Sequence, residues 1–221
     1  MSIAKGEIAG LKLIGGALCL DFANTSGWRP DPGDEEYLRD FEDLLVWSEH
    51  AGALDGAEAR ALARTGKTEP EKARTIHRRA VALRDAVYRI FSAVAADRRA
   101  GAGDVDLLNR IIDDAYRHLR LVPRGAGFAW EWYGVEGALE LPLWRVARSA
   151  ADLLVSPELE RVRECSGDRC DWLFLDASKN RSRRWCDMAN CGNRAKARRN
   201  YERRRANAGA MPMRRVEKRE T

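Results

Sequence analysis

Four cysteines lie close together in the last third of the sequence, and their spacing could build a metal site. Cys165 and Cys170 form one pair, and fifteen residues separate this pair from Cys186 and Cys191. This pattern is typical of a four-thiolate zinc site, because each pair can occupy one tight turn while the intervening chain folds back. We therefore expect one Zn²⁺ per chain, held by these four cysteines.

Other chemistry is open to four thiols. They could form two disulfides, but the longest apolar run, residues 13–20, contains two glycines and ends at Asp21, so it predicts neither a signal peptide nor a membrane span. We expect a cytoplasmic location, where structural disulfides are rare. The same thiolates could instead hold iron or an iron–sulfur cluster. The remaining cysteine, Cys19, is expected to be a small core residue.

Positive charge is concentrated in the same part of the chain. The net charge of the protein is +5, but residues 179–221 contain 15 Lys and Arg against 4 Asp and Glu, which leaves −6 for residues 1–178. Such an asymmetry favours a polyanionic partner. The alternatives are a basic tail that only improves solubility and a zinc module that binds another protein. Basic charge beside a zinc site favours nucleic acid binding.

A small module must position the cysteines. Residues 171–176 predict a strand, residues 180–184 a turn that returns through Trp185, and residues 191–205 a helix with Cys191 in or near its first turn. A knuckle, a hairpin and a helix of this kind would form a treble-clef-like finger. The module has few apolar residues, so metal binding should supply most of its folding free energy.

The helix over 191–205 is the predicted nucleic acid reader, because it is polar nearly all round. Arginine can contact guanine or phosphate through two parallel hydrogen bonds, so we expect Arg194 and Arg198 to face bases and Arg181 and Arg184 to hold phosphate. The residues expected to contact nucleic acid are Lys179, Arg181, Arg183, Arg184, Asn193, Arg194, Lys196, Arg198, Arg199, Arg203 and Arg205.

The preceding residues, 1–156, predict an α+β domain that is mostly helical with small β hairpins. Apolar residues at spacings of three and four predict helices over about 34–50, 56–64, 71–99, 104–118 and 142–154. This domain has apolar stripes of its own and should not need the metal.

Two hairpins are expected in this domain. Apolar runs on both sides of Gly15-Gly16 predict one over residues 7–25. Alternating residues over 119–141 predict another, with its turn at 134–137 and its aromatic residues in the core. The tail over 206–221 has no periodicity and is expected to be disordered.

Catalytic motifs are weak in this sequence. Asp21 and Asn24 follow an apolar run and are the best polar candidates for a ligand site, although contacts to neighbouring backbone are the favoured role for Asp21. The Gly66-Lys67-Thr68 segment lacks the earlier glycine of a phosphate loop, and no serine is framed as a nucleophile elbow. We do not expect an enzyme.

The finger segment, residues 161–205, resembles the CGNR zinc-finger family, whose signature stands here as Cys191-Gly192-Asn193-Arg194. The segment over 15–25 is similar to the opening of the ABATE domain, which usually precedes this finger in bacterial proteins, although Ala23 stands where a larger apolar residue is expected. The resemblance implies an ABATE-like domain over 1–156 and a stress-responsive transcriptional regulator.

These observations predict a DNA-binding transcriptional regulator without a membrane partner. Its finger would bind DNA, and its N-terminal domain would sense a signal, such as a small-molecule effector, or form a homodimer. Two alternatives remain: an RNA-binding factor that uses the same basic module, and an enzyme or ligand-binding N-terminal domain anchored by the finger.

Overall fold

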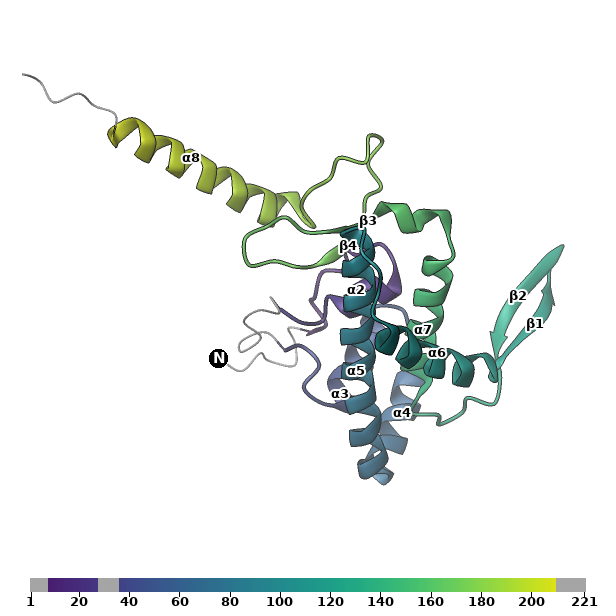
Figure 1. The fold of residues 1–221 in the computed structure, drawn as a ribbon. Coiled ribbons are helices and arrows are strands. Elements are labelled where there is room, and N and C mark those ends of the chain that lie inside the picture. Colours follow the sequence, from purple (N-terminus) through teal and green to yellow (C-terminus); the bar gives the residue numbers. More distant parts are fainter. Residues whose placement is uncertain (1–7, 28–35, 210–221) are drawn as a thin grey trace, which may run out of the picture.

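Helices packed around one hydrophobic core form the body of the protein (Figure 1). The computed structural model describes residues 8–27 and 36–209. In chain order the helices of the body are α2 (Leu18–Ala23), α3 (Phe41–His50), α4 (Gly56–Thr68), α5 (Pro70–Ala95), α6 (Ala102–Tyr116) and α7 (Leu141–Leu154). The long α5 packs against each of the others, because its buried residues recur at spacings of three and four along one face.

The predicted helices are present, with different ends. Helix α3 begins at Phe41, because the Asp40 side chain accepts a hydrogen bond from the Asp43 backbone and caps the helix. Helix α4 begins with a capping box formed by Asp55 and Glu58, and it ends four residues later than expected. Helix α6 begins at Ala102, two residues before the expected start at Asp104, whose carboxylate binds Arg89 of α5 at 2.6 Å.

The predicted hairpin over residues 7–25 is wrong in the part that the structure describes, where helix α2 follows Gly15-Gly16. Cys19, Leu20, Phe22 and Ala23 of α2 are all buried, with only Asp21 between them, so these apolar residues show no clear period and are compatible with either strand or helix. Gly16 has φ of +80°, which permits the sharp entry into the helix.

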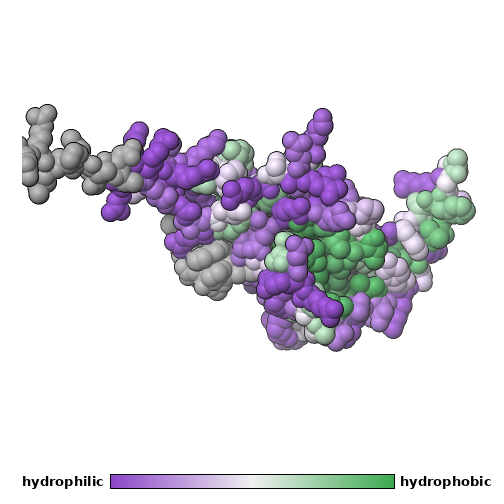
Figure 2. All heavy atoms as spheres, turned by 45° about the horizontal axis from the view of Figure 1, so that its top comes forward, coloured by the Kyte–Doolittle hydropathy of each residue, from purple (hydrophilic) through white to green (hydrophobic). Residues whose placement is uncertain are grey.

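The second predicted hairpin exists, but its turn and its surroundings differ from the prediction. β1 (Leu119–Arg124) and β2 (Gly127–Trp132) pair antiparallel, and the chain turns at Gly125, with φ of +60°, rather than at residues 134–137. The hairpin projects from the body (Figure 1), and Figure 2 shows hydrophobic side chains on the projection. Phe128 is 75% exposed and Trp130 is 45% exposed, so the expected core position is wrong for these two residues.

The finger begins with a strand that was not predicted from the sequence. After the 3₁₀ helix η1 (Pro157–Arg161), β3 (Val162–Glu164) pairs antiparallel with β4 (Leu173–Leu175). The strand expected over 171–176 therefore pairs with the segment before it, and not with a return at Trp185. Val162 and Leu173 lie in the same hydrophobic core as the helices, so this core extends across the predicted domain boundary.

The last helix leaves the body of the protein. A π-helical turn, η2 (Met188–Gly192), leads into α8 (Asn193–Gly209), which projects on the side away from β1 and β2 (Figure 1). The residues 206–209, which were expected to be disordered, continue this helix, and the rest of the predicted tail lies outside the described residues. Within the described part of the chain, no helix has the length and apolar character needed to cross a membrane.

Candidate metal centre and nucleic-acid interface

The four predicted cysteines meet at one point. The sulfur atoms of Cys165, Cys170, Cys186 and Cys191 all lie within 4.8 Å of one another. Cys186 Sγ lies 3.6 Å from Cys170 Sγ and 3.7 Å from Cys191 Sγ. Four thiolates at about 2.3 Å from a tetrahedral zinc would have their sulfurs about 3.8 Å apart, so the arrangement fits this ion. The cysteines are arranged to bind one Zn²⁺, as their spacing predicted.

Short loops at the ends of β3 and β4 bring the cysteines together. Cys165 directly follows β3, and its sulfur accepts hydrogen bonds from the backbone NH groups of Gly167 at 3.4 Å and Cys186 at 3.3 Å. A side chain at Gly167 would lie 3.1 Å from Cys191 Cβ and 3.2 Å from both nearby sulfurs. Glycine at this position therefore allows the first loop to approach the second cysteine pair.

The thiols influence one another strongly. Hydrogen bonds from Cys170 and Cys186 lower the pKa of Cys165, while the hydrogen bond to Cys165 raises the pKa of Cys170. Clustered thiols cannot all ionise without a compensating cation, so metal uptake should release protons. Arg194 supplies part of the compensating charge, since its Nη2 donates to Cys191 Sγ at 3.2 Å.

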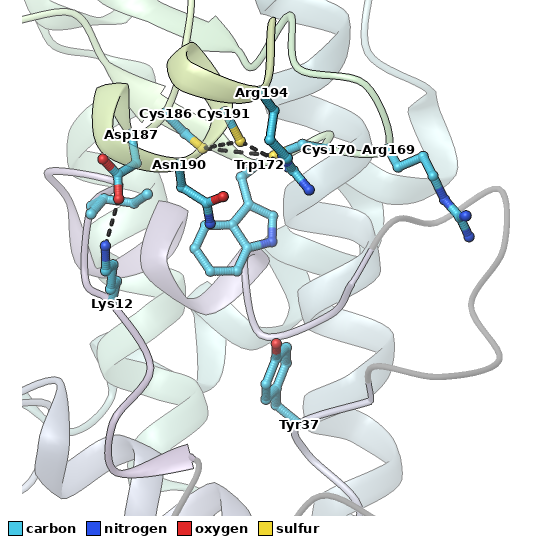
Figure 3. A pocket seen from close by; sticks show the side chains of 11 residues that line it. Lys12, Tyr37, Arg169, Cys170, Trp172, Cys186, Asp187, Asn190, Cys191 and Arg194 are labelled. Atoms are coloured by element: carbon cyan, nitrogen blue, oxygen red, sulfur yellow. Dashed lines mark hydrogen bonds and ion pairs between the residues drawn. The ribbon is translucent and has the colours of Figure 1, made fainter. Parts of the chain in front are cut away.

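A pocket of 220 Å³ opens beside the sulfurs, between the finger and the N-terminal segment (Figure 3). Lys12 and Tyr37 line it from the body, and Trp172 and Arg194 line it from the finger. Lys12 Nζ binds Asp187 at 2.6 Å, and this hydrogen bond lowers the pKa of the Asp187 carboxyl. The N-terminal segment is thus held next to the metal centre.

The two candidate ligand residues of the body both contact backbone. Asn24 is buried and forms two hydrogen bonds with Leu173 of β4: its Nδ2 donates to the carbonyl at 2.9 Å, and its Oδ1 accepts from the NH at 2.8 Å. Asp21 accepts a hydrogen bond from the Gly15 NH at 2.7 Å, and burial raises its pKa to about 6. Asp21 has the backbone role that was favoured, and neither residue lines the pocket beside the cysteines.

Three of the predicted nucleic acid contacts also have partners within the finger. The Arg183 guanidinium lies 4.4 Å from the Phe174 ring centre and donates to the Trp185 and Cys186 carbonyls. Arg194 contacts Cys191, as described, and the Asn193 side chain donates to the Ala189 carbonyl at 3.0 Å. Arg183 and Arg194 are therefore positioned to hold the loops and the sulfurs; Arg194 is also exposed, and its expected contact with bases stays a prediction.

The other basic residues lie on the surface of the turn and of α8. Arg184, Arg198 and Arg199 line a hollow of 230 Å³ together with Ser166 and Trp185. Arg199 also lines a groove of 500 Å³ along α8, and its other lining residues are Lys196, Asn200 and Arg203. The two hollows share Arg199, and we call their basic lining residues, Arg184, Lys196, Arg198, Arg199 and Arg203, the basic track. Trp185 was not predicted as part of this surface, although its place after two arginines was a signal.

Arg198 of this track and the remaining predicted contacts, Lys179, Arg181 and Arg205, lie on the surface. Arg181 pairs with Glu160 at 3.0 Å, and Arg198 pairs with Asp168 at 3.2 Å; all four side chains are about half exposed or more. Arg205 lies over the Tyr201 ring, 5.8 Å from its centre. Lys179 is exposed in the turn that precedes Arg181. These ion pairs are exposed and weak, so a phosphate could displace them.

The fold and the metal centre define a zinc-finger protein whose finger is built onto a helical domain. Comparison with protein families gives the same division: residues 161–204 match the CGNR zinc finger, and residues 16–157 match the ABATE family, described as "putative stress-induced transcription regulator". The second match covers more than half of the chain, so this protein belongs to the ABATE family. Both families were predicted from the sequence, and neither is an enzyme family. No curated protein matches the chain.

Proposed function

We propose that this protein is a cytoplasmic DNA-binding transcriptional regulator and not an enzyme. The observation that carries the proposal is α8, a helix that projects from the body and is anchored through the metal centre at its first turn. Residues 193–209 contain seven Lys and Arg and a single Glu. An exposed basic helix of this kind can enter the major groove, where arginine contacts base edges and phosphates.

The basic track suggests how the finger would lie on DNA. Lys196, Arg199 and Arg203 recur at spacings of three and four on α8, and we assign them to the groove. Lys179, Arg181 and Arg184 in the preceding turn are assigned to phosphates. Arg198 and Arg205 lie on the opposite side of α8, and Arg198 would contact the DNA backbone through the hollow that it shares with Arg184 and Arg199. The zinc centre supports the function by fixing the angle between the turn and the helix.

Charge reversal on α8 tests the proposal. Genomic fragments protected by the purified protein would first supply a binding sequence. The double variant R199E/R203E should then abolish binding in fluorescence anisotropy, while the matched variant R74E/R78E, which reverses two exposed arginines of α5, should bind normally. If about five phosphates are contacted, the wild-type affinity should fall with salt with a log–log slope of about −4 to −5. Normal DNA binding by R199E/R203E would contradict the proposal.

RNA is the second candidate partner, and one observation favours it. Trp185 lies among Arg184, Arg198 and Arg199, and an aromatic ring in a basic hollow is suited to stack an unpaired base. Duplex DNA and a structured RNA, titrated at equal salt, distinguish the two partners. Binding of the RNA that is at least as tight as that of the selected DNA, and that is lost in a Trp185→Ala variant, would replace the DNA proposal.

The helical domain would supply the regulation. The domain would regulate the finger either by binding a small-molecule effector or by forming a homodimer. A reducing cytoplasm suits either route, because the four metal-binding thiols must remain reduced.

A further inference from the structure

A second hollow is lined by residues of α4. In Figure 1, α4 lies at the opposite end of the body from β3, β4 and α8. Its volume is 420 Å³, which is within the range of small-molecule sites. Its walls come from α4, from the base of β2 and from the segment that leads into α7. They consist mainly of the apolar side chains of Ala61, Leu62, Trp132, Val135 and Leu141.

Two carboxylates also line this hollow, and they differ in their partners. Glu58 receives hydrogen bonds from Arg145 at 2.6 and 2.7 Å and from the Asp55 NH at 2.9 Å. Burial alone would raise its pKa, but these hydrogen bonds keep the pKa of Glu58 below its ordinary value. The Glu136 carboxylate, by contrast, forms no hydrogen bond or ion pair with any residue in the described part of the chain.

The Arg145 guanidinium already has several partners beside the hollow. Besides Glu58, its guanidinium binds the Ala53 carbonyl, and it lies 5.9 Å from the centre of the Trp132 ring. The charges of Arg145 and Glu58 therefore cancel. The Glu136 carboxylate gives the hollow one negative charge, which lies beside an apolar wall. Such a site attracts a cation and repels an anion.

We propose that this hollow binds a small organic cation, such as an aromatic amine, whose apolar body packs on Trp132 and Leu62 while its ammonium group meets Glu136. The ring of Trp132 is half-buried, so a flat ligand can cover it without any rearrangement of the core. The site goes beyond the proposed function, which names no ligand, and binding is measured on the protein without nucleic acid. Its failure would leave the DNA proposal unaffected.

The test is a calorimetric titration of the full chain with phenethylammonium, compared with 3-phenylpropionate, an anion of similar size. We expect saturable binding of the cation only. Glu136→Gln should weaken it about threefold to fivefold, which is the effect of losing one partly exposed charge pair. Glu131→Gln is the matched control, because this nearby carboxylate pairs with Arg120 and does not line the hollow. It should leave the affinity unchanged.

A second variant tests the cavity itself. Ala61→Phe would place a ring inside the hollow from a partly exposed position on α4, and it should abolish binding while circular dichroism confirms the fold. Equal binding of the anion, equal loss in Glu131→Gln, or no saturation at about 10 mM of the cation would each overturn the proposal. Should Ala61→Phe fail to fold, the comparison of the two glutamate variants decides the question alone.

Discussion

The described part of the chain contains two antiparallel hairpins with opposite surroundings. β3 and β4 have only three residues each, but they pack against α2 and α5, and Leu173 and Phe174 are fully buried. β1 and β2 have six residues each, yet Phe128 and Leu121 are mostly exposed. A two-stranded sheet is marginal by itself. The comparison shows that packing, rather than strand length, decides which hairpin belongs to the stable core.

The short hairpin also joins the finger to the helical domain. Val162 and Leu173 contribute to the main core, and Asn24 of the body hydrogen-bonds the Leu173 backbone twice. The long hairpin is held by its own cross-strand pairs, such as Leu121 opposite Trp130, and by Arg148, whose guanidinium lies 5.1 Å from the Trp130 ring centre. Perturbing the first hairpin should therefore affect the whole chain, and perturbing the second should not.

The largest effect is expected from loss of the metal. Cys191→Ser should remove zinc, unfold the finger and abolish DNA binding, since structural zinc contributes about 10–16 kcal/mol in finger peptides. The apolar stripes of the helical domain had predicted that it would be unaffected. Because Leu173 lies in the shared core, hydrogen exchange should instead increase in β3, β4 and α2, while α4 remains protected.

The control for this experiment is Cys19→Ala. Cys19 is buried in α2, where burial raises the pKa of its thiol to about 12, and it lies outside the metal cluster. Elemental analysis should show about one zinc per chain in this variant and in the wild type. A metal-free wild type with protected amides in β4 would contradict the zinc assignment.

The next largest effect compares one leucine from each hairpin. Leu173→Ala should reduce the free energy of unfolding by about 2–5 kcal/mol, because it creates a cavity in the shared core. Leu121→Ala removes the same atoms from a side chain that is 58% exposed, so its effect should be within about 0.5 kcal/mol. Urea denaturation measures both. Equal losses would mean that the long hairpin is also part of the core.

The free energy of unfolding should depend on pH through Asp21, which is connected to the short hairpin through Gly15. Burial raises the folded-state pKa of Asp21 from 3.8 to about 6, so the folded protein favours the protonated form. The stability that results is fully present below pH 3.8 and is lost as the pH rises through 6, by up to about 3 kcal/mol.

Asp21→Asn isolates this contribution. The amide oxygen can still accept from Gly15, whose own carbonyl accepts from Leu175 of β4 at 2.8 Å, but it does not titrate. The difference in unfolding free energy between the variant and the wild type should increase between about pH 5 and 7. Metal loss at low pH affects both proteins alike. A difference that stays constant over this range would show that Asp21 is ionised throughout.

The metal centre was predictable because its ligands are defined by residue type and spacing. The metal centre needs only two turns that face each other. The close spacing within each cysteine pair, Cys165 with Cys170 and Cys186 with Cys191, indicates both turns. The helices were predictable for a similar reason, since an apolar residue at every third or fourth position matches the period of a helix and not that of a strand. Their ends were less predictable, because the start of a helix can depend on a single capping side chain, as Asp40 shows for α3.

The parts that were missed depend on contacts distant in sequence. The strand β3 has three residues without an apolar pattern, and it is a strand because β4 and α5 lie beside it. The apolar residues of α2 are buried on nearly every side of the helix, so their spacing in the sequence does not follow the helical period. Arg183 and Arg194 look like their surface neighbours in the sequence, and only the folded finger shows that they point toward Phe174 and Cys191.

The smallest effect is expected when the long hairpin is shortened. Leu119 and Trp132 are direct partners at its base, so an Asn-Gly turn can replace residues 120–131 and still connect them. The segment removed contains mainly exposed side chains and the Arg120–Glu131 pair, in which both are about half exposed. Because such pairs contribute at most about 1 kcal/mol, the melting temperature should change by only a few degrees.

This shortened protein also tests whether the exposed strands have a role between molecules. Light scattering of the wild type and the shortened form should give the same mass if the hairpin is only a projection. A wild-type dimer that becomes a monomer on shortening would instead identify β1 and β2 as the homodimer contact, because the apolar side chains of Leu121 and Phe128 would then have a partner. If shortening lowers the free energy of unfolding of a monomeric protein by more than about 3 kcal/mol, the contrast between the two hairpins is wrong. The long hairpin would then stabilise the core as the short one does.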